Sequence, residues 1–433
     1  MDKEVNEGGR LAARPAFATT PGIAQKSSLA RSPSLAASLS GERFLVSYLL
    51  RGDEKQARAM ASDICFEQTV EFPEDLVPPG LIRDAIVGRI ESLEAVERSG
   101  DVARSDAAEL GLGAAGQGPR PGLHRATISF AVETAQADIV QLLNVVYGNI
   151  SIKPNIRVER LDLPESLLAN FPGPSFGRPG LRELLGVPTR PLTSTALKPM
   201  GLSPAEIADQ AYRFALGGID IIKDDHGILD QIFCPFEERV ERCAEAVARA
   251  NRETGLRSVY MANITGRMDR ILSSARRAKE LGAGALLICP ALTGFDAVRL
   301  IAEDAAIGLP IMAHPSFGGV LATSRDSGIS HAALYGTLMR LCGADASVYP
   351  NFGGRFSFTK EECVGIARAT GERLGALKQA FPAPGGGMTP ERTAEMLEVY
   401  GKDFILLVGA GLHRNSPDLA ANARQLLGML RMM

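Results

Sequence analysis

Residues 217–226 read GGIDIIKDDH, a short apolar run that ends in a dense group of titratable side chains. The run Ile219–Lys223 is rich in isoleucine and predicts a buried strand. Because side chains alternate along an extended chain, Lys223 and Asp225 are expected on one side of it. Carboxylates, an imidazole and a lysine this close together predict a site for a hard metal ion. An ion-pair network that caps the strand is the alternative.

This strand is one of eight that we predict from residue 192 onward, where short apolar runs alternate with long amphipathic runs. The predicted strands are Thr193–Leu197, Ile219–Lys223, Ser258–Asn263, Ala285–Cys289, Pro310–Ala313, Ala346–Tyr349, Phe381–Pro384 and Phe404–Val408. The intervening predicted helices include Ala205–Phe214, Glu237–Glu253 and Arg267–Glu280. Ser203 and Thr359 are each followed three residues later by Glu, which predicts capping boxes. Eight consecutive β-then-α units predict a (β/α)8 TIM barrel, with a doubly wound sheet as the alternative.

A smaller α+β region precedes the barrel. Its predicted elements are strands at Phe44–Leu49 and His124–Val132, helices at Glu54–Ile64 and Ala135–Asn144, and an extended segment at Gly148–Ile152. Residues 97–122 are polar and rich in Gly, Ala and Pro, which predicts a loop or insertion. The expected organisation is a disordered extension over residues 1–41, an α+β domain over 42–160, a connector over 161–191 and the barrel over 192–433.

The bulk composition is the one expected of a cytoplasmic globular enzyme. The chain has 433 residues, of which 45% are hydrophobic and 22% charged, as in ordinary globular domains. The net charge of −3 provides no bulk attraction to nucleic acid or an anionic membrane. The 6 cysteines form no CxxC pair and predict reduced core residues. No apolar run reaches the roughly 18 residues that span a bilayer, and the N-terminal stretch lacks the apolar core of a secretory signal.

The candidate site is defined by position, because catalytic residues of a TIM barrel lie just after the C-terminal ends of its strands. Lys198 ends the first strand and can act as a general base; a solvated surface lysine is the alternative. His314 follows the fifth strand, where a structural role is as consistent as a catalytic one. The sixth strand ends in the polar run 349–351, and the glycines and Arg355 after it predict a loop that closes on an anion.

Glycines follow the seventh and eighth strands, where barrel enzymes commonly bind phosphate. They are Gly386, Gly387, Gly409 and Gly411. Without a side chain, these positions let backbone N–H groups approach an anion closely. The pattern predicts that the substrate carries a phosphate group.

Residues 217–226 resemble the GGxDxxKDDE segment of the RuBisCO large subunit, and the resemblance runs from about residue 43 to the C-terminus. Phe171–Pro174, with Gly177 following, is similar to the family's interdomain connector. Thr195–Ser203 is similar to its first barrel strand with the lysine, and Leu292–Phe295 to its fourth. The glycines after the seventh and eighth strands are similar to its phosphate loops.

The resemblance implies a role for each matching residue. The implied catalytic residues are Lys198, His314, Asn149 and Glu67. Lys223 would be carbamylated by CO2 and would bind Mg2+ together with Asp225. Lys198 would abstract a proton next to a carbonyl. Asn149 and Glu67 would reach the site from a neighbouring subunit, which implies at least a homodimer.

The departures from the family pattern are equally informative. His226 stands where the family has its third metal ligand, a Glu. Because imidazole suits Mg2+ less well than carboxylate, Mn2+ or another transition ion is one alternative. The other alternative is that His226 does not bind the metal. Met200 replaces a second lysine after the first strand, Pro315 replaces an arginine, and the loop after the sixth strand lacks a lysine. In the family those groups hold a second phosphate and the added carboxylate. Their loss argues against CO2 fixation and favours a monophosphate.

The resemblance therefore implies a RuBisCO-like (form IV) enzyme that uses metal-stabilised enediolate chemistry. The first hypothesis is decarboxylation or transcarboxylation and hydrolysis of a phosphorylated β-keto sugar acid, with 3-oxo-isoapionate 4-phosphate preferred because His226 and the run 349–351 are polar. The alternative is an enolase or isomerase of a methylthio-ketose phosphate in methionine salvage, whose apolar tail Phe352 and Phe356 could line. A non-catalytic sensor or scaffold is a third hypothesis, which would not need the strand-end lysines.

Overall fold

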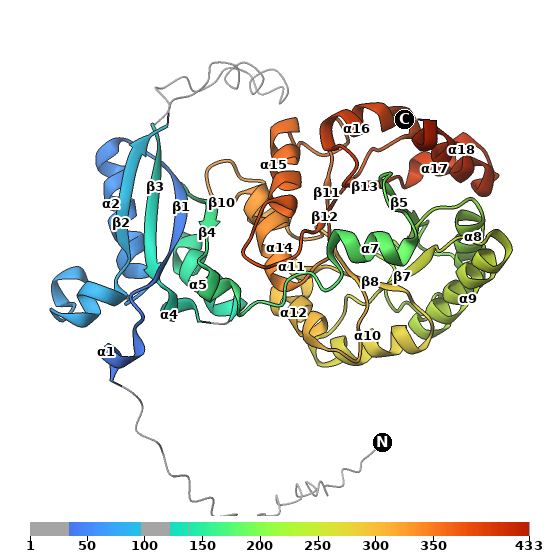
Figure 1. Cartoon of the computed structure of the whole chain (residues 1–433). Coiled ribbons are helices and arrows are strands. Elements are labelled where there is room, and N and C mark those ends of the chain that lie inside the picture. Colours follow the sequence, from blue (N-terminus) through green and yellow to red (C-terminus); the bar gives the residue numbers. More distant parts are fainter. Residues whose placement is uncertain (1–33, 97–121, 137, 433) are drawn as a thin grey trace, which may run out of the picture. The chain divides into compact units, whose positions relative to one another are not determined.

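The computed structural model describes residues 34–96, 122–136 and 138–432 (Figure 1). Leu39–Met433 form one compact unit, and α1 (Leu35–Ser38) belongs to a separate one. Most of the expected N-terminal extension and most of the expected loop at 97–122 lie outside the described residues. Among the described residues, no helix is both long and apolar enough to cross a membrane.

An eight-stranded parallel sheet forms the barrel, in the order β12-β11-β9-β8-β7-β6-β5-β13. Its strands are β5 (Leu192–Leu197), β6 (Ile221–Asp224), β7 (Val259–Asn263), β8 (Ala285–Ile288), β9 (Ile311–Ala313), β11 (Ala346–Pro350), β12 (Phe381–Gly385) and β13 (Ile405–Leu407). β12 lies against β13, because a Cβ at Gly385 would be 2.8 Å from a methyl carbon of Leu407. Each strand overlaps one of the eight predicted strands, which confirms the predicted fold class.

Helices follow the strands around the barrel (Figure 1). The main ones are α8 (Pro204–Leu216), α9 (Phe236–Thr254), α10 (Ile271–Glu280), α12 (Phe295–Glu303), α14 (Met339–Cys342), α15 (Lys360–Gly371), α16 (Thr393–Tyr400) and α18 (Leu419–Met432). Both predicted capping boxes form, at Ser203 on α8 and at Thr359 on α15. The segment 161–191 contains α6 (Glu165–Leu168) and α7 (Gly177–Leu185). All 6 cysteines are buried and free, as predicted.

A second sheet has the strand order β10-β4-β1-β3-β2. Its strands are β1 (Arg43–Arg51), β2 (Arg89–Ala95), β3 (Leu123–Ala131), β4 (Ile156–Asp162) and β10 (Gly328–Ile329), with helices α2 (Glu54–Glu67), α4 (Val132–Ala135) and α5 (Ile139–Tyr147) beside them in the chain. β10 comes from the connection between β9 and β11 and pairs in parallel with β4. The barrel portion of the chain therefore contributes one strand to this sheet.

The prediction of an extended segment at Gly148–Ile152 is wrong. Residues Asn149–Ile152 form a 3-10 helix, and the strand begins later, with β4. The Ile150 N–H donates to the side-chain oxygen of Gln68 at 3.1 Å, and the Ser151 N–H donates to Gly148 O at 3.0 Å. These bonds hold the backbone in a tight turn, which an alternating apolar pattern does not reveal.

Alternate strand residues fill the inside of the barrel. The inner cluster contains Leu192, Ile221, Met261, Ala285, Leu287, Met312, Ala346, Val348, Phe381, Ala383, Ile405 and Leu407. Because strand side chains repeat with a period of two, the next inward positions at the C-terminal strand ends follow directly. They are Lys198, Lys223, Asn263, Cys289, His314, Pro350, Gly385 and Gly409. This layer forms the floor of the candidate site.

The first glycine of the 217–226 segment is required by helix packing. A Cβ at Gly217 would overlap the Cβ of Ala423 in α18 and lie 2.7 Å from Ala420 O. We expect Gly217→Ala to lower the free energy of unfolding by about 1–3 kcal/mol, the usual cost of overpacking. Gly428→Ala, on α18 with no neighbour within 4 Å of the new Cβ, should instead stabilise by up to about 1 kcal/mol. Urea unfolding measures both, and equal losses in the two variants would contradict this packing argument.

Candidate active site at the barrel mouth

The structure brings together five of the predicted site residues at the C-terminal ends of β5, β6 and β9. They are Lys198, Lys223, Asp225, His226 and His314. Lys198 Nζ lies 2.5 Å from Asp225 Oδ1. His226 Nδ1 lies 3.5 Å from the same oxygen, and the His226 ring stacks on His314 with centroids 4.4 Å apart and planes at 9°. A carboxylate therefore lies between a lysine and an imidazole at the mouth of the barrel.

Lys223 is buried beneath this cluster, with 2% of its surface exposed. Its Nζ donates a hydrogen bond to Asp224 O at 3.0 Å. Burial lowers the pKa of Lys223 to about 8, although the nearby Asp225 carboxylate opposes the shift. An amine with this pKa is neutral in a useful fraction of molecules near neutral pH. Only a neutral amine can react with CO2, so Lys223 has the chemistry that carbamylation requires.

Asp225 is held ionised by its neighbours. Burial raises the pKa of its carboxyl group, but hydrogen bonds from His226 and Lys198 outweigh burial and bring that pKa well below its usual range. An ionised carboxylate facing the mouth is a suitable oxygen ligand for a divalent cation.

His314 is kept neutral. Desolvation, followed by the positive charge of Lys223, lowers the pKa of His314 well below its usual value. Its Nδ1 accepts a hydrogen bond from the Ser316 N–H at 3.2 Å. We infer that the ring proton is therefore on Nε2. A neutral imidazole with this tautomer can donate a hydrogen bond to a substrate oxygen.

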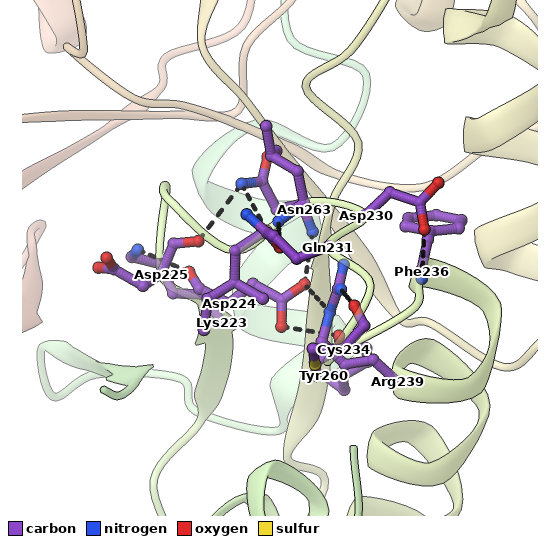
Figure 2. A network of polar contacts seen from close by, with 12 residues as sticks. Lys223, Asp224, Asp225, Asp230, Gln231, Cys234, Phe236, Arg239, Tyr260 and Asn263 are labelled. Carbon is purple, nitrogen blue, oxygen red and sulfur yellow. Dashed lines mark hydrogen bonds and ion pairs between the residues drawn. The ribbon is translucent and has the colours of Figure 1, made fainter. Parts of the chain in front are cut away.

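The neighbouring carboxylate of Asp224 points the other way. Figure 2 shows it reaching toward Arg239 and Tyr260, while Asp225 extends away from them. Tyr260 OH donates to Asp224 Oδ1 at 2.8 Å, and Arg239 Nε donates to Asp224 Oδ2 at 3.2 Å. The Asp224 and Arg239 side chains are both fully buried. The sequence allowed either an ion-pair network that caps the strand or a metal site. Asp224 belongs to an ion-pair network, and Asp225 faces the candidate site.

The donor set fits a divalent cation if Lys223 is carbamylated. Within the described parts of the chain, no three His, Cys, Asp or Glu side chains come together as a metal site. Asp225 and His226 offer one oxygen and one nitrogen ligand, and a carbamate on Lys223 would add the missing oxygen. If His226 ligates, its imidazole suits Mg2+ less well than a carboxylate would, which favours Mn2+ or another transition ion.

The predicted phosphate glycines lie in two loops at the mouth. Gly386 and Gly387 have φ of 77° and 107°, a conformation that favours glycine. A Cβ at Gly354 would overlap Gly386 O, so the loops after β11 and β12 touch. Gly409 lies beside Lys198, because a Cβ there would be 3.8 Å from Lys198 Cε. A Cβ at Gly411 would lie 2.8 Å from the Met388 carbonyl oxygen. Phosphate binding by these loops stays a prediction.

Asn149 and Glu67 lie together in the N-terminal region. Asn149 Nδ2 donates to Glu67 Oε1 at 3.0 Å, and both side chains are accessible. Among the described residues, no hydrogen bond or ion pair joins either of them to the barrel cluster of the same chain. Their participation in a site from a neighbouring subunit, which the resemblance implies, stays a prediction.

The polar end of the sixth barrel strand does not face the site. Tyr349 and Asn351 are fully buried, and Asn351 Oδ1 accepts a hydrogen bond from Tyr400 OH at 2.6 Å. Because Ala346 and Val348 are the inward residues of β11, Tyr349 points outward toward the helices. The interpretation of residues 349–351 as a polar substrate wall is therefore wrong.

Instead, apolar side chains are exposed on three mouth loops. Met200 after β5 is 53% exposed, Phe317 after β9 is 62% exposed and Phe356 after β11 is 46% exposed. The Phe356 ring lies close to Gly386, 3.2 Å from the position that a Cβ would take there. Exposed apolar groups beside a polar cluster are typical of a binding surface for a ligand that is partly apolar.

Two residues without a predicted role support the cluster through the backbone. Gln210 on α8 accepts from Lys198 N–H at 3.2 Å and donates to Lys198 O at 2.6 Å. Asn263, on β7, donates to carbonyl groups of the segment 225–228. The inward period of the strand could have indicated Asn263, but no sequence pattern marks Gln210, because its partners are main-chain atoms.

The fold and this cluster define a class of protein: a (β/α)8 barrel with an ionisable strand-end site. Residues 179–426 match the family model described as the ribulose bisphosphate carboxylase large chain, catalytic domain. Ribulose bisphosphate carboxylase-like protein 1 of Rhodopseudomonas palustris is 36% identical over 88% of this chain and 96% of that protein. The 5-methylthioribulose-1-phosphate isomerase of Rhodospirillum rubrum is 35% identical over 86% of this chain and 91% of that one. A crystal structure of a Rubisco-like protein from Rhodopseudomonas palustris has a TM-score of 0.77 at 35% identity, over 90% of this chain and 97% of the other.

The chain therefore belongs to the ribulose bisphosphate carboxylase large-chain family, among its RuBisCO-like members. This confirms the resemblance seen in the sequence.

Proposed function

We propose that this protein is an enzyme that transfers a proton next to the carbonyl group of a phosphorylated ketose and does not fix CO2. The observation that carries the proposal is the contact of Lys198 with Asp225 above the buried Lys223. This arrangement places a candidate base next to a candidate metal site. The mouth lacks the second lysine and the loop lysine that the family uses for a bisphosphate and for added CO2.

The favoured substrate is a methylthio-ketose phosphate, the alternative in the sequence analysis. The exposed Met200, Phe317 and Phe356 would contact an apolar tail, and the glycine loops after β12 and β13 would bind one phosphate. A relative named as an isomerase of such a compound supports this choice.

In the proposed reaction, Lys198 Nζ in its unprotonated form accepts the proton next to the carbonyl, becomes an ammonium paired with Asp225, and returns a proton to the neighbouring carbon. Neutral His314 donates a hydrogen bond from Nε2 to a substrate oxygen on which negative charge develops. Asp225, His226 and carbamylated Lys223 would hold Mg2+ or Mn2+, which supplies further stabilisation of that charge when bound.

A second candidate is the sugar acid 3-oxo-isoapionate 4-phosphate. Tyr349 and Asn351 are buried away from the site and no longer support this substrate. The stacked imidazoles of His226 and His314 do favour it. Beside Lys198, the two rings could bind the carboxylate that decarboxylation or transcarboxylation and hydrolysis requires.

Incubation in D2O with Mg2+ or Mn2+ and bicarbonate tests these candidates. NMR would follow 5-methylthioribulose 1-phosphate and 3-oxo-isoapionate 4-phosphate in parallel, with Lys223→Ala as the control. Deuterium uptake and isomerisation of the first compound alone support the proposal. CO2 with a four-carbon ketose phosphate from the second compound would indicate a decarboxylase, and phosphoglycerate with glycolate a transcarboxylase and hydrolase. No turnover together with no Mn2+ binding would favour the sensor or scaffold hypothesis.

The proposed enzyme works as a homodimer or a larger homo-oligomer. The accessible Asn149–Glu67 pair supports this, because no hydrogen bond or ion pair among the described residues joins it to the barrel cluster of its own chain. Ile152, in the same 3-10 helix as Asn149, is 85% exposed. Covering this apolar side chain against a second copy would stabilise the assembly. Analytical ultracentrifugation of wild type and Ile152→Asp measures the effect.

With bicarbonate adjusted at each pH so that dissolved CO2 stays constant, activation by Mg2+ and CO2 should become faster as the pH rises from about 7 to about 9, because the carbamate forms only on the unprotonated amine and the pKa of Lys223 is about 8. Progress curves recorded after addition of metal and bicarbonate measure this rate. Lys223→Met should show no slow activation, whereas the exposed-lysine control Lys402→Met should behave as wild type. A rate that does not change with pH would argue against carbamylation.

A further inference from the structure

Asn263 is the common partner of several main-chain groups next to the proposed metal ligands. It ends β7, which pairs with β6, and its side chain is buried. Its Nδ2 lies 3.3 Å from Asp225 O, 3.0 Å from His226 O and 3.1 Å from Ile228 O. One amide group therefore contacts three carbonyl oxygens of a single four-residue segment.

The orientation of this amide is fixed from its other side. Asn263 Oδ1 accepts a hydrogen bond from the Thr265 N–H at 3.1 Å, so the NH2 group must face the segment 225–228. An aspartate in the same place would have no N–H to donate and would place a carboxylate against three carbonyl oxygens. The position therefore requires an amide and not simply a polar residue of this size.

The backbone of the same residue holds the end of β6. The Asn263 N–H donates to Asp224 Oδ2 at 2.9 Å. Asp224 is in turn bound by Arg239 and Tyr260, so the residue before the proposed ligands cannot rotate freely. Hydrogen bonds therefore hold Asp224, the residue just before the segment 225–228. The Asn263 amide binds carbonyl groups within the segment itself.

Gln231 and Asp230 restrain the next part of this loop. Gln231 Nε2 donates to Gly227 O at 2.8 Å and Gln231 Oε1 accepts from the Leu229 N–H at 2.9 Å. Asp230 Oδ1 accepts from the Phe236 N–H at 2.9 Å, at the start of α9. These side chains reach no nearer to the proposed ligands than Gly227 O. The Asp225 carbonyl accepts the Ile228 N–H at 3.0 Å, and the side chain that donates to the carbonyl groups of residues 225 and 226 is Asn263.

We infer that Asn263 is a positioning residue, which sets the directions of the Asp225 and His226 side chains by holding the carbonyl groups of the same two residues. The inference rests on the proposed metal site, and Asn263 touches neither metal nor substrate in it. Partners of metal ligands typically change metal affinity by about 10–100-fold when they are removed.

Asn263→Asp and Asn263→Ser test the inference, the second because it removes the three side-chain bonds with less repulsion. The control is Asn251→Ala. Asn251 makes an equivalent pair of bonds to the Ser258 main chain, at 2.8 and 2.9 Å, at the N-terminal end of β7, whereas Asn263 lies at its C-terminal end. The probe is Mn2+ with bicarbonate, titrated by calorimetry.

We expect both Asn263 variants to weaken Mn2+ binding by about 10–100-fold and Asn251→Ala to leave the Kd unchanged. Hydrogen–deuterium exchange provides a readout without metal: the Ile228 N–H, bonded to Asp225 O at 3.0 Å, should exchange faster in the Asn263 variants alone. Wild-type affinity in both Asn263 variants, or an equal loss in Asn251→Ala, would overturn the inference. If wild type binds no Mn2+, the proposed metal site fails, and the exchange of Ile228 alone decides the role of Asn263.

Discussion

Lys198→Met is expected to lower turnover by about 100- to 10,000-fold, the usual contribution of a positioned general base. Methionine keeps much of the length of the side chain and removes the group that would accept the proton. The partner carboxylate, Asp225, loses its ion pair at 2.5 Å and becomes more available to a cation. Steady-state kinetics on the substrate identified by NMR gives the loss, and calorimetry should give a Mn2+ affinity equal to or tighter than that of wild type.

Lys153→Met is the matched control. Lys153 Nζ forms a similar ion pair with Asp63 Oδ2 at 2.6 Å, outside the barrel. We expect it to change neither turnover nor metal affinity. Turnover retained by Lys198→Met would mean that another group is the base.

Arg239→Met is expected to lower the free energy of unfolding by about 3–5 kcal/mol, because it leaves the buried Asp224 carboxylate without its countercharge. Both side chains of this pair are fully buried. Urea unfolding followed by circular dichroism measures the change. The double variant Asp224→Asn with Arg239→Met should recover part of the loss, since it removes the unpaired charge.

Arg242→Met provides the comparison on the same helix, α9. Arg242 Nε lies 2.8 Å from Glu238 Oε1, but both side chains are about half exposed to solvent. Such a surface pair contributes at most about 1 kcal/mol. If Arg239→Met and Arg242→Met lower the free energy of unfolding by similar amounts, breaking the buried Asp224 pair costs no more than breaking a surface pair.

The barrel could be predicted because each of its strands is short, apolar and followed by an amphipathic helix. The same period of two correctly placed Lys223 and Asp225 on one side. The same period implies that Tyr349 points outward, because Val348 points inward. Residues 349–351 were wrongly expected to face the substrate because they were considered as one polar group and their directions were not assigned one residue at a time. Position within the period therefore carries more information than composition at the strand end.

Other features depend on partners that lie far away in the sequence. β2 was missed because its residues, Arg89–Ala95, alternate charged with small or apolar groups and most are exposed at the edge of the sheet. The roles of Gln210 and Asn263 were missed because their partners are main-chain atoms, which have the same chemistry in every sequence. Only the folded chain identifies which carbonyl groups they meet.

The pairing of β10 with β4 has a consequence for synthesis of the chain. Val158 in β4 pairs with Ile329, which the ribosome adds much later, and the guanidinium group of Arg157 also binds Ala322 O, at 3.1 Å. At about 5–20 residues per second, β4 waits roughly ten to thirty seconds for its partner. During that interval its edge is open to other chains, so a chaperone that shields nascent strands should raise the yield of this protein more than that of a barrel enzyme that sends no strand to an N-terminal sheet.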